Sequence, residues 1–174
     1  MSRTRTVARI AVLSALIYVL SWATFYLPNV SAAYFLAFAA GWMWGIVPGL
    51  LSGAVGMWLW TSFNPYGPAI PPIMISQIVG LALCGLVGAS LKSVISSTFS
   101  KRTIVILLGA SILCSIAYFV PVNLVDAWIA QPFWPRFYTS MIWSSWAMLS
   151  NLLIFPLFFP LISRISLRER PLNS

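Results

Sequence analysis

The chain has 174 residues, of which 60% are hydrophobic and only 7% are charged, and its mean hydropathy is +0.93. Soluble domains carry roughly 25% charged residues, so this composition excludes an ordinary soluble protein and predicts an integral membrane protein. The net charge of +8 comes from basic residues scattered between apolar segments, a pattern typical of topology determinants facing anionic lipid and not of nucleic-acid binding.

Apolar segments between prolines, glycines and charged residues predict the helices. A helix needs about 20 apolar residues to cross a bilayer, so the chain has room for six spans with short loops. We place them at residues 6–27, 32–46, 48–62, 72–92, 103–130 and 137–163. The sequence therefore predicts an all-α integral membrane protein, a compact six-helix transmembrane bundle that forms a single domain over residues 1–174.

The first span resembles a signal peptide, because arginines precede an apolar segment. However, Val7 to Leu27 is longer than the apolar region of about 7 to 15 residues in a removable signal, so we expect a spanning helix. The second and third spans are short, and Ala32 to Thr61 could instead form one long helix.

The basic residues favour six spans over five. With six spans every basic residue except Arg136 falls on one side of the membrane, whereas five spans would split them, against the positive-inside rule. We therefore expect both termini in the cytoplasm. The residues placed there are Arg3, Arg5, Arg9, Lys92, Lys101, Arg102, Arg164, Arg168 and Arg170.

Glycines and prolines mark two connections. In GIVPGLLSGAVG, Pro48 can start a helix, and Gly45, Gly49 and Gly53 recur every four residues, which lets a neighbouring backbone approach closely. The loop NPYGPAIPP, from Asn64 onward, holds four prolines and is therefore preshaped. Such a loop either contributes to ligand binding on the outer face or simply connects two helices.

Few polar side chains lie inside the apolar spans. Asp126 is the single acid at membrane depth, because Glu169 is in the basic tail, and Asn123 shares its helix face. Asp126 is either a functional group or a helix-end carboxylate paired with Arg136. Pro121 should bend or interrupt this helix. We expect Asn151 to form an interhelical hydrogen bond.

Polar and aromatic residues collect at the outer ends of the predicted helices. Aromatic belts at the membrane interface explain most tryptophans, but aromatic walls with a few polar groups also suit a ring-containing ligand. The outer tryptophans are Trp22, Trp58, Trp60, Trp128, Trp134, Trp143 and Trp146. The candidate outer polar layer comprises Asn64, Tyr66, Gln77, Asn123 and Asp126.

Catalysis by this chain is not expected. It has no histidine, only one acid at membrane depth and no GxxxxGK[ST] phosphate loop, which excludes Ser-His chemistry, an aspartyl dyad and ATP hydrolysis by that route. Cys84 and Cys114 lie in apolar spans and are expected to be packing residues, with no metal site and no disulfide.

Three features follow one another along the chain: the alanines of the first helix, the segment GIVPGLLSGAVG and the segment LWTSFNPYGPAIPPIMISQIVG. Together they resemble the S component of energy-coupling factor (ECF) vitamin transporters. The resemblance implies a substrate-binding subunit in a prokaryotic cell membrane that captures a vitamin at its outer face. It also implies partners, namely a transmembrane coupling protein and two cytoplasmic ATPases that use the ATP. No cofactor is implied in this chain.

The resemblance also assigns residues. The AxxxA motif that contacts the coupling protein matches Ala11 and Ala15, and we add Ala8 to this interface. The substrate would lie under the outer loops, so Asn29 and Trp128 join the candidate layer. The vitamin stays open. The aromatic wall favours a ring, and cobalamin is one candidate, for which Cys84 could be imagined as a cobalt ligand although core packing suits its inner position better.

Two other functions stay open. The chain could be a noncatalytic membrane scaffold, in which case no ligand would stabilise it. It could also be a solitary transporter that works without the ATPases.

Overall fold

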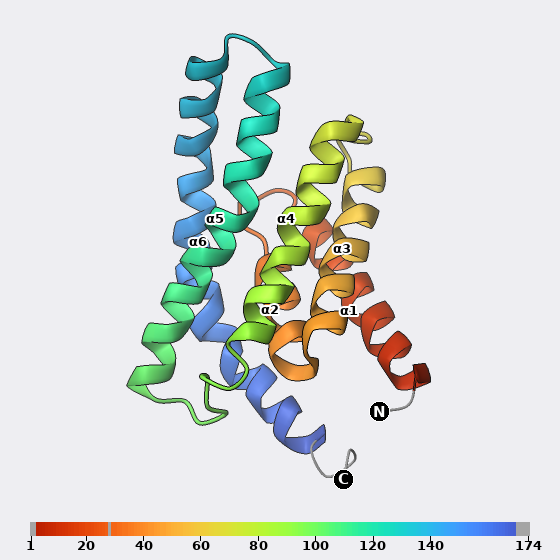
Figure 1. Ribbon diagram of the computed structural model, residues 1–174, viewed down its shortest axis with the longest axis vertical. Coiled ribbons are helices and arrows are strands. Elements are labelled where there is room, and N and C mark those ends of the chain that lie inside the picture. Colours follow the sequence, from red (N-terminus) through yellow and green to blue (C-terminus); the bar gives the residue numbers. More distant parts are fainter. Residues whose placement is uncertain (1–2, 28, 170–174) are drawn as a thin grey trace.

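The computed structural model describes residues 3–27 and 29–169, and the regular secondary structure in this part of the chain is all α-helical, without strands (Figure 1). Each predicted span corresponds to one helix within several residues, so the all-α prediction is confirmed. The helices are α1 (Arg3–Ala23), α2 (Ala33–Trp44), α3 (Ile46–Phe63), α4 (Pro71–Ser90), α5 (Lys101–Ile129) and α6 (Phe133–Glu169).

The chain runs up and down through the bundle. The start of α1 and the end of α6 lie at the same end, which we call the terminal end (Figure 1). The α1–α2, α3–α4 and α5–α6 connections lie toward the opposite end, which we call the loop end. All predicted cytoplasmic residues except Arg170, which is outside the described residues, belong to helix ends or connections at the terminal end, and Arg136 belongs to the loop end.

Five of the six helices are long and apolar enough to cross a membrane, and α2 is the exception. Its 12 residues extend about 18 Å, against a hydrocarbon core of about 30 Å. Eleven of the 12 are buried, so α2 lies in the interior of the bundle, surrounded by its neighbours. Of the six predicted spans, five thus have the length and composition of a membrane crossing, and the span predicted at residues 32–46 is a short buried helix.

α2 and α3 are separate helices because the chain turns at Gly45. The φ angle of Gly45 is +96°, a conformation that residues with a Cβ atom rarely adopt. The alternative of one long helix over Ala32 to Thr61 is thus wrong. Nothing lies within 4 Å of a Cβ atom added at Gly45, so Gly45 is needed for the turn and not for close packing.

Other glycines let the backbones of α2, α3 and α4 touch. A Cβ atom added at Gly49 would lie 2.7 Å from the carbonyl oxygen of Gly85, and one added at Gly53 would lie 2.5 Å from that of Leu81. The expected packing role of Gly49 and Gly53 is confirmed, and the facing backbone of α4 belongs to Gly85 and Leu81.

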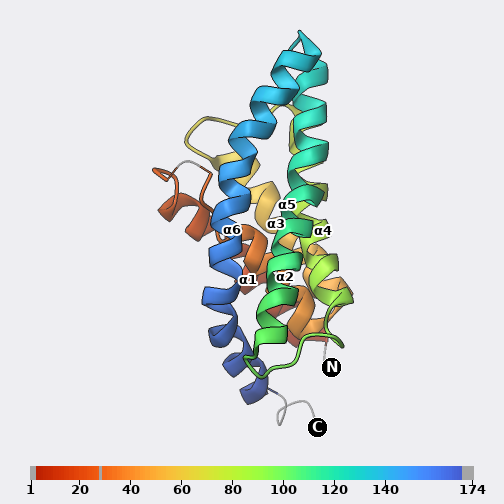
Figure 2. The same cartoon turned by 90° about the vertical axis from the view of Figure 1, so that its left-hand side faces the viewer.

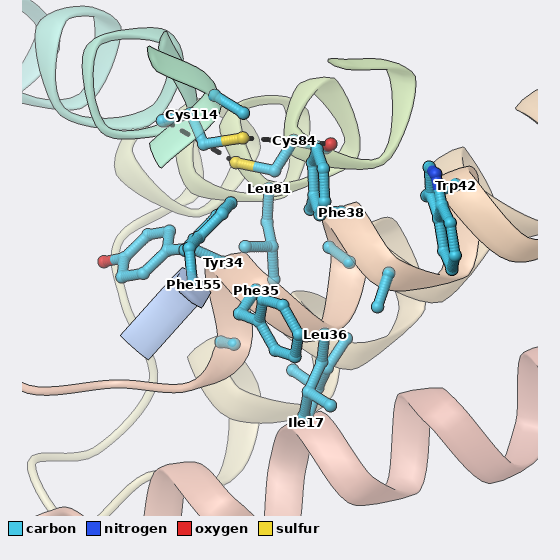
Figure 3. Packing of buried hydrophobic residues seen from close by; sticks show 14 of the residues in the cluster. Ile17, Tyr34, Phe35, Leu36, Phe38, Trp42, Leu81, Cys84, Cys114 and Phe155 are labelled. Atoms are coloured by element: carbon cyan, nitrogen blue, oxygen red, sulfur yellow. Dashed lines mark hydrogen bonds between the residues drawn. The ribbon is translucent and has the colours of Figure 1, made fainter. Parts of the chain in front are cut away.

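Aromatic rings from α2 and α6 fill the core (Figure 3). The Phe155 ring lies 5.4 Å from the Phe35 ring and 5.1 Å from the Phe38 ring, measured between centroids. Cys84 and Cys114 are fully buried between α4 and α5, where the Cys84 thiol donates to the Cys114 carbonyl oxygen at 3.5 Å. Both cysteines are free packing residues, as expected.

α5 and α6 form a hairpin that extends beyond the other helices at the loop end (Figures 1 and 2). With 29 and 37 residues, they extend about 43 and 55 Å. α5 continues through Pro121, so of the two expectations, a bend or an interruption, the interruption is wrong. Asn151 Nδ2 donates to Ser115 Oγ at 3.0 Å, which confirms its role as an interhelical hydrogen bond.

Candidate functional site

A cavity of about 600 Å³ opens toward the loop end of the bundle. We call it the loop-end cavity. The α1–α2 connection, α2, α3 and α4 form one side, and the α5–α6 hairpin forms the other. Its lining includes Phe25, Asn29, Tyr34, Trp60, Tyr66, Gln77, Tyr118, Phe119, Asn123, Arg136, Ser140, Trp143 and Ser144.

Aromatic side chains make up the apolar part of the wall. Tyr34 and Tyr118 are buried and meet edge to face at 5.0 Å between ring centroids, and Phe119 packs against both. The Tyr118 hydroxyl donates to Met57 Sδ at 3.8 Å. Trp60 and Trp143 add further aromatic surface. Such surfaces accommodate a flat ring.

Hydrogen-bonded side chains from α5 and α6 form one polar wall. Asn123 Nδ2 donates to Ser144 Oγ at 2.8 Å, and Ser144 Oγ donates to the Ser140 carbonyl oxygen at 2.8 Å. Ser140 Oγ donates to Asp126 Oδ2 at 3.4 Å. Because these groups hold one another in place, the wall is preorganised for polar contacts.

Gln77 is the polar group from α4. Its Oε1 atom is buried and has no hydrogen-bond partner among the described residues. A buried acceptor without a partner costs about 1 to 3 kcal/mol. Since Gln77 lines the loop-end cavity, rotation of its side-chain amide would turn Oε1 toward a donor on a bound molecule.

Arg136 and Asp126 form an ion pair near the cavity. Arg136 Nε lies 2.7 Å from Asp126 Oδ2 and Arg136 Nη2 lies 3.2 Å from Oδ1. Arg136 lines the cavity, whereas Asp126 does not. Of the two expectations for Asp126, the geometry therefore agrees with the helix-end carboxylate paired with Arg136.

The α1–α2 connection is joined to α6 by hydrogen bonds. Asn29 has a φ of +56°, and its Nδ2 donates to the Trp143 carbonyl oxygen at 2.9 Å. Ser150 Oγ donates to the Asn29 carbonyl oxygen at 3.4 Å. The Phe25 ring also lies 4.9 Å from the Tyr66 ring, so this connection touches the α3–α4 loop as well.

Asn64 organises the α3–α4 loop from within. Its Nδ2 donates to the Gly67 carbonyl oxygen at 2.9 Å, and its Oδ1 accepts from the Tyr66 amide at 2.9 Å. Gly67 has a φ of +88°. The loop is thus held by the Asn64 side chain as well as by its prolines, and it presents Tyr66, which is 82% exposed, at the rim of the cavity.

The structure brings together four of the seven predicted ligand residues, Asn29, Tyr66, Gln77 and Asn123. The other three do not line the cavity. The Asn64 side chain bonds within its own loop, and the Asp126 carboxylate pairs with Arg136. Trp128 is 76% exposed. Sequence reasoning missed Tyr34, Tyr118, Ser140 and Ser144. The four-residue spacing of Ser140 and Ser144 could have predicted that both hydroxyls lie on one face of the helix. Tyrosines within apolar spans, in contrast, look like ordinary core residues.

The predicted partner residues of α1 do not share one environment. Ala11 and Ala15 are exposed on the surface of the bundle. Ala8 is also exposed, but it lines a second hollow between α1, α2 and α6.

These features define a helical integral membrane protein with a cavity at one end. Residues 1–164 match the family described as ECF-type riboflavin transporter, S component, and the chain belongs to this family. No curated protein and no solved structure shows significant similarity to the chain. The resemblance drawn from the sequence is thus confirmed. The family is a substrate-binding component of a transporter and not a class of enzymes.

Proposed function

We propose that the chain is the high-affinity, membrane-embedded binding subunit of an ECF-type importer and captures riboflavin or a related ring-containing vitamin in the loop-end cavity. The observation that carries this proposal is the combination of aromatic walls, a preorganised polar wall and the unsatisfied Gln77 acceptor in one cavity. The loop end would face the outside and the terminal end the cytoplasm, as the positive-inside rule requires.

Riboflavin suits this cavity chemically. Its flat tricyclic ring can stack on aromatic faces, its ring imide can donate to an acceptor such as Gln77 Oε1, and its hydroxylated chain can bond to Asn123 and the α6 hydroxyls. A volume of about 600 Å³ is within the range of about 300 to 1,000 Å³ for pockets that hold drug-sized ligands. Cobalamin is much larger, so riboflavin is the first compound to test and cobalamin the second.

Of the predicted ligand residues, we propose direct contacts for Asn29, Tyr66, Gln77 and Asn123. Asp126 would act indirectly by holding Arg136, and Asn64 by shaping the loop that carries Tyr66. We retain no ligand role for Trp128. At an aqueous interface its indole suits the membrane headgroup region.

Import would require partner proteins, because the sequence holds no GxxxxGK[ST] phosphate loop. The proposed partners are the transmembrane coupling protein and two cytoplasmic ATPases of the ECF module. Ala11 and Ala15 form a flat strip of small side chains on α1, which suits close approach of a partner helix.

The test is a titration of the purified protein with riboflavin, followed by the intrinsic fluorescence of both molecules. We expect tight, saturable quenching, a rise in the melting temperature, and riboflavin or a related compound among small molecules released from gently purified protein. A panel of vitamins including cobalamin that neither binds nor stabilises the protein would favour the scaffold.

Reconstitution separates a binding subunit from a solitary transporter. Proteoliposomes that contain this chain alone should bind riboflavin without accumulating it. Accumulation without the coupling protein and ATPases would contradict the proposal.

A further inference from the structure

The second hollow is a cleft of about 880 Å³ between α1 and α6, with α2 as its floor. We call it the lateral cleft. Within the described part of the chain, the backbone of α1 packs on α2 and α3 but does not approach that of α6. At the terminal end the two helices are joined by side chains, where Arg9 Nη2 lies 2.5 Å from Glu169 Oε2.

The walls of the lateral cleft are apolar, mostly aliphatic, and open. Val12 of α1 is 64% exposed, and Leu161 and Ile165 of α6 are 57% and 39% exposed, although all three line the cleft. Phe35 and Leu36 of α2 lie at its floor. Inside a bilayer, hydrocarbon is the medium that fills such a surface.

The chemistry changes at the terminal end of the cleft. Arg5 and Arg9 line it there, and Arg3 and Arg168 are exposed close by in the chain. Among the described residues of the lining, Glu169 is the one carboxylate, and it binds Arg9 and accepts from Trp44 Nε1 at 2.8 Å. This end is therefore positively charged, which complements an anionic headgroup.

A lipid of one leaflet fits within the length of the cleft. Half of a hydrocarbon core of about 30 Å corresponds to about ten residues of helix. Counted from Arg5 and Arg9, this length reaches residues 15 to 19, beside Leu16 and Leu20 of the lining, and the lining continues beyond them to Thr24. A diacyl lipid with its phosphate at the arginines would therefore lie along the cleft up to the middle of the bundle.

Neighbouring faces of α1 suit different occupants. Ala11 and Ala15 lie beside the cleft and not in its lining, and their small side chains suit a helix at close range. The cleft itself presents bulky branched side chains and arginines, which fit flexible acyl chains and a phosphate. We propose that the lateral cleft binds one anionic phospholipid, its phosphate at Arg5 and its acyl chains between α1 and α6. This requires only that the chain is embedded in a bilayer, and not that it binds a vitamin.

The experiment uses the full chain in nanodiscs of equal parts phosphatidylglycerol and phosphatidylcholine, transferred to detergent and examined by native mass spectrometry. We expect retained phosphatidylglycerol in excess over phosphatidylcholine, and Arg5→Gln should reduce that excess about fivefold. Leu161→Trp, which fills the cleft, should abolish retention. Arg102→Gln, at an exposed site on α5, and Leu153→Trp, at a 72% exposed site of α6 outside the cleft, are the matched controls.

Equal retention of the two lipids, or equal losses in the cleft variants and their controls, would overturn the proposal. So would a copurifying protein that Leu161→Trp displaces in the absence of bound lipid, because the cleft would then hold a partner helix. Circular dichroism and the melting temperature of Leu161→Trp establish that a loss of lipid is not a loss of fold.

Discussion

Gln77 is half-buried, but its Oε1 atom is buried and has no hydrogen-bond partner among the described residues. Replacing Gln77 can therefore separate an effect on binding from an effect on folding. Replacing Gln77 with Leu removes the buried acceptor that we assign to the ligand. We expect riboflavin affinity to fall about tenfold, the value of one good hydrogen bond. The melting temperature of the empty protein should stay the same or rise, because an unpaired buried oxygen is removed.

The Gln77→Leu result is measured by fluorescence titration and thermal unfolding on the same preparation. Unchanged affinity together with a lower melting temperature would mean that the Gln77 amide supports the bundle and does not contact the ligand.

Variants of Asp126 and Arg136 test whether Arg136 contacts the ligand while Asp126 only holds Arg136 in place. Arg136 is 51% exposed in its side chain, and exposed pairs contribute at most about 1 kcal/mol, so neither Asp126→Asn nor Arg136→Gln should lower stability by more. We expect Arg136→Gln to weaken riboflavin binding more than Asp126→Asn does, since only Arg136 lines the cavity. The reverse order in titrations would restore Asp126 as a direct ligand contact.

At the scale of the residue, the sequence predicted which polar side chains are important better than it predicted the direction in which they point. Gln77 and Asn123 stood out because amides are costly in an apolar span, and both line the cavity. Asp126 stood out for the same reason, but the direction of its side chain depends on Arg136, ten residues later. Tyr34 and Tyr118 gave no signal, because an aromatic residue in a span is equally suited to core, lipid or cavity.

At the scale of the helix, two helices whose backbones touch leave no room for a larger side chain at the contact. A Cβ atom added at Gly88 of α4 would lie 1.9 Å from the Phe38 carbonyl oxygen of α2, and backbone cannot give way as a flexible side chain does. We expect Gly88→Ala to destabilise the protein by about 2 kcal/mol or more, within the usual cost of overpacking. A clearly lower melting temperature in detergent would show this.

Gly109 of α5 is the matched control, because nothing lies within 4 Å of a Cβ atom added there. Gly109→Ala should leave the melting temperature unchanged or raise it, since alanine favours helix over glycine. Equal losses in the two variants would mean that α2 and α4 do not pack as closely as described.

The helices themselves were predictable from composition, whereas the character of α2 was not. Apolar segments between Pro and Gly located every helix within several residues, and the spacing of Gly49 and Gly53 predicted close packing. The burial of α2 on nearly all sides depends on the positions of α3, α4 and α6 around it. A uniformly apolar segment looks the same whether lipid or protein surrounds it.

At the scale of the whole molecule, the loop-end cavity lies where two parts of the bundle meet. The α5–α6 hairpin forms one part, α1 to α4 form the other, and residues of both line the cavity. A bound ligand would join them and should therefore raise the melting temperature. Charge distribution predicted this arrangement in outline, since it placed both ends of the chain at one end of the bundle.

The connection between α1 and α2 spans this junction, and it gives the last prediction. The two residues are in contact, because Ser150 Oγ donates to the Asn29 carbonyl oxygen at 3.4 Å. The double variant Asn29→Cys and Ser150→Cys is therefore a candidate disulfide pair, and loss of free thiol on oxidation establishes that the bond forms. If the connection must move for the vitamin to enter, the oxidised empty protein should bind riboflavin far more slowly than the reduced protein. Protein loaded first and then oxidised should release it far more slowly. Equal exchange rates in stopped-flow fluorescence before and after reduction would show that the vitamin enters elsewhere, past Tyr66 and the α3–α4 loop.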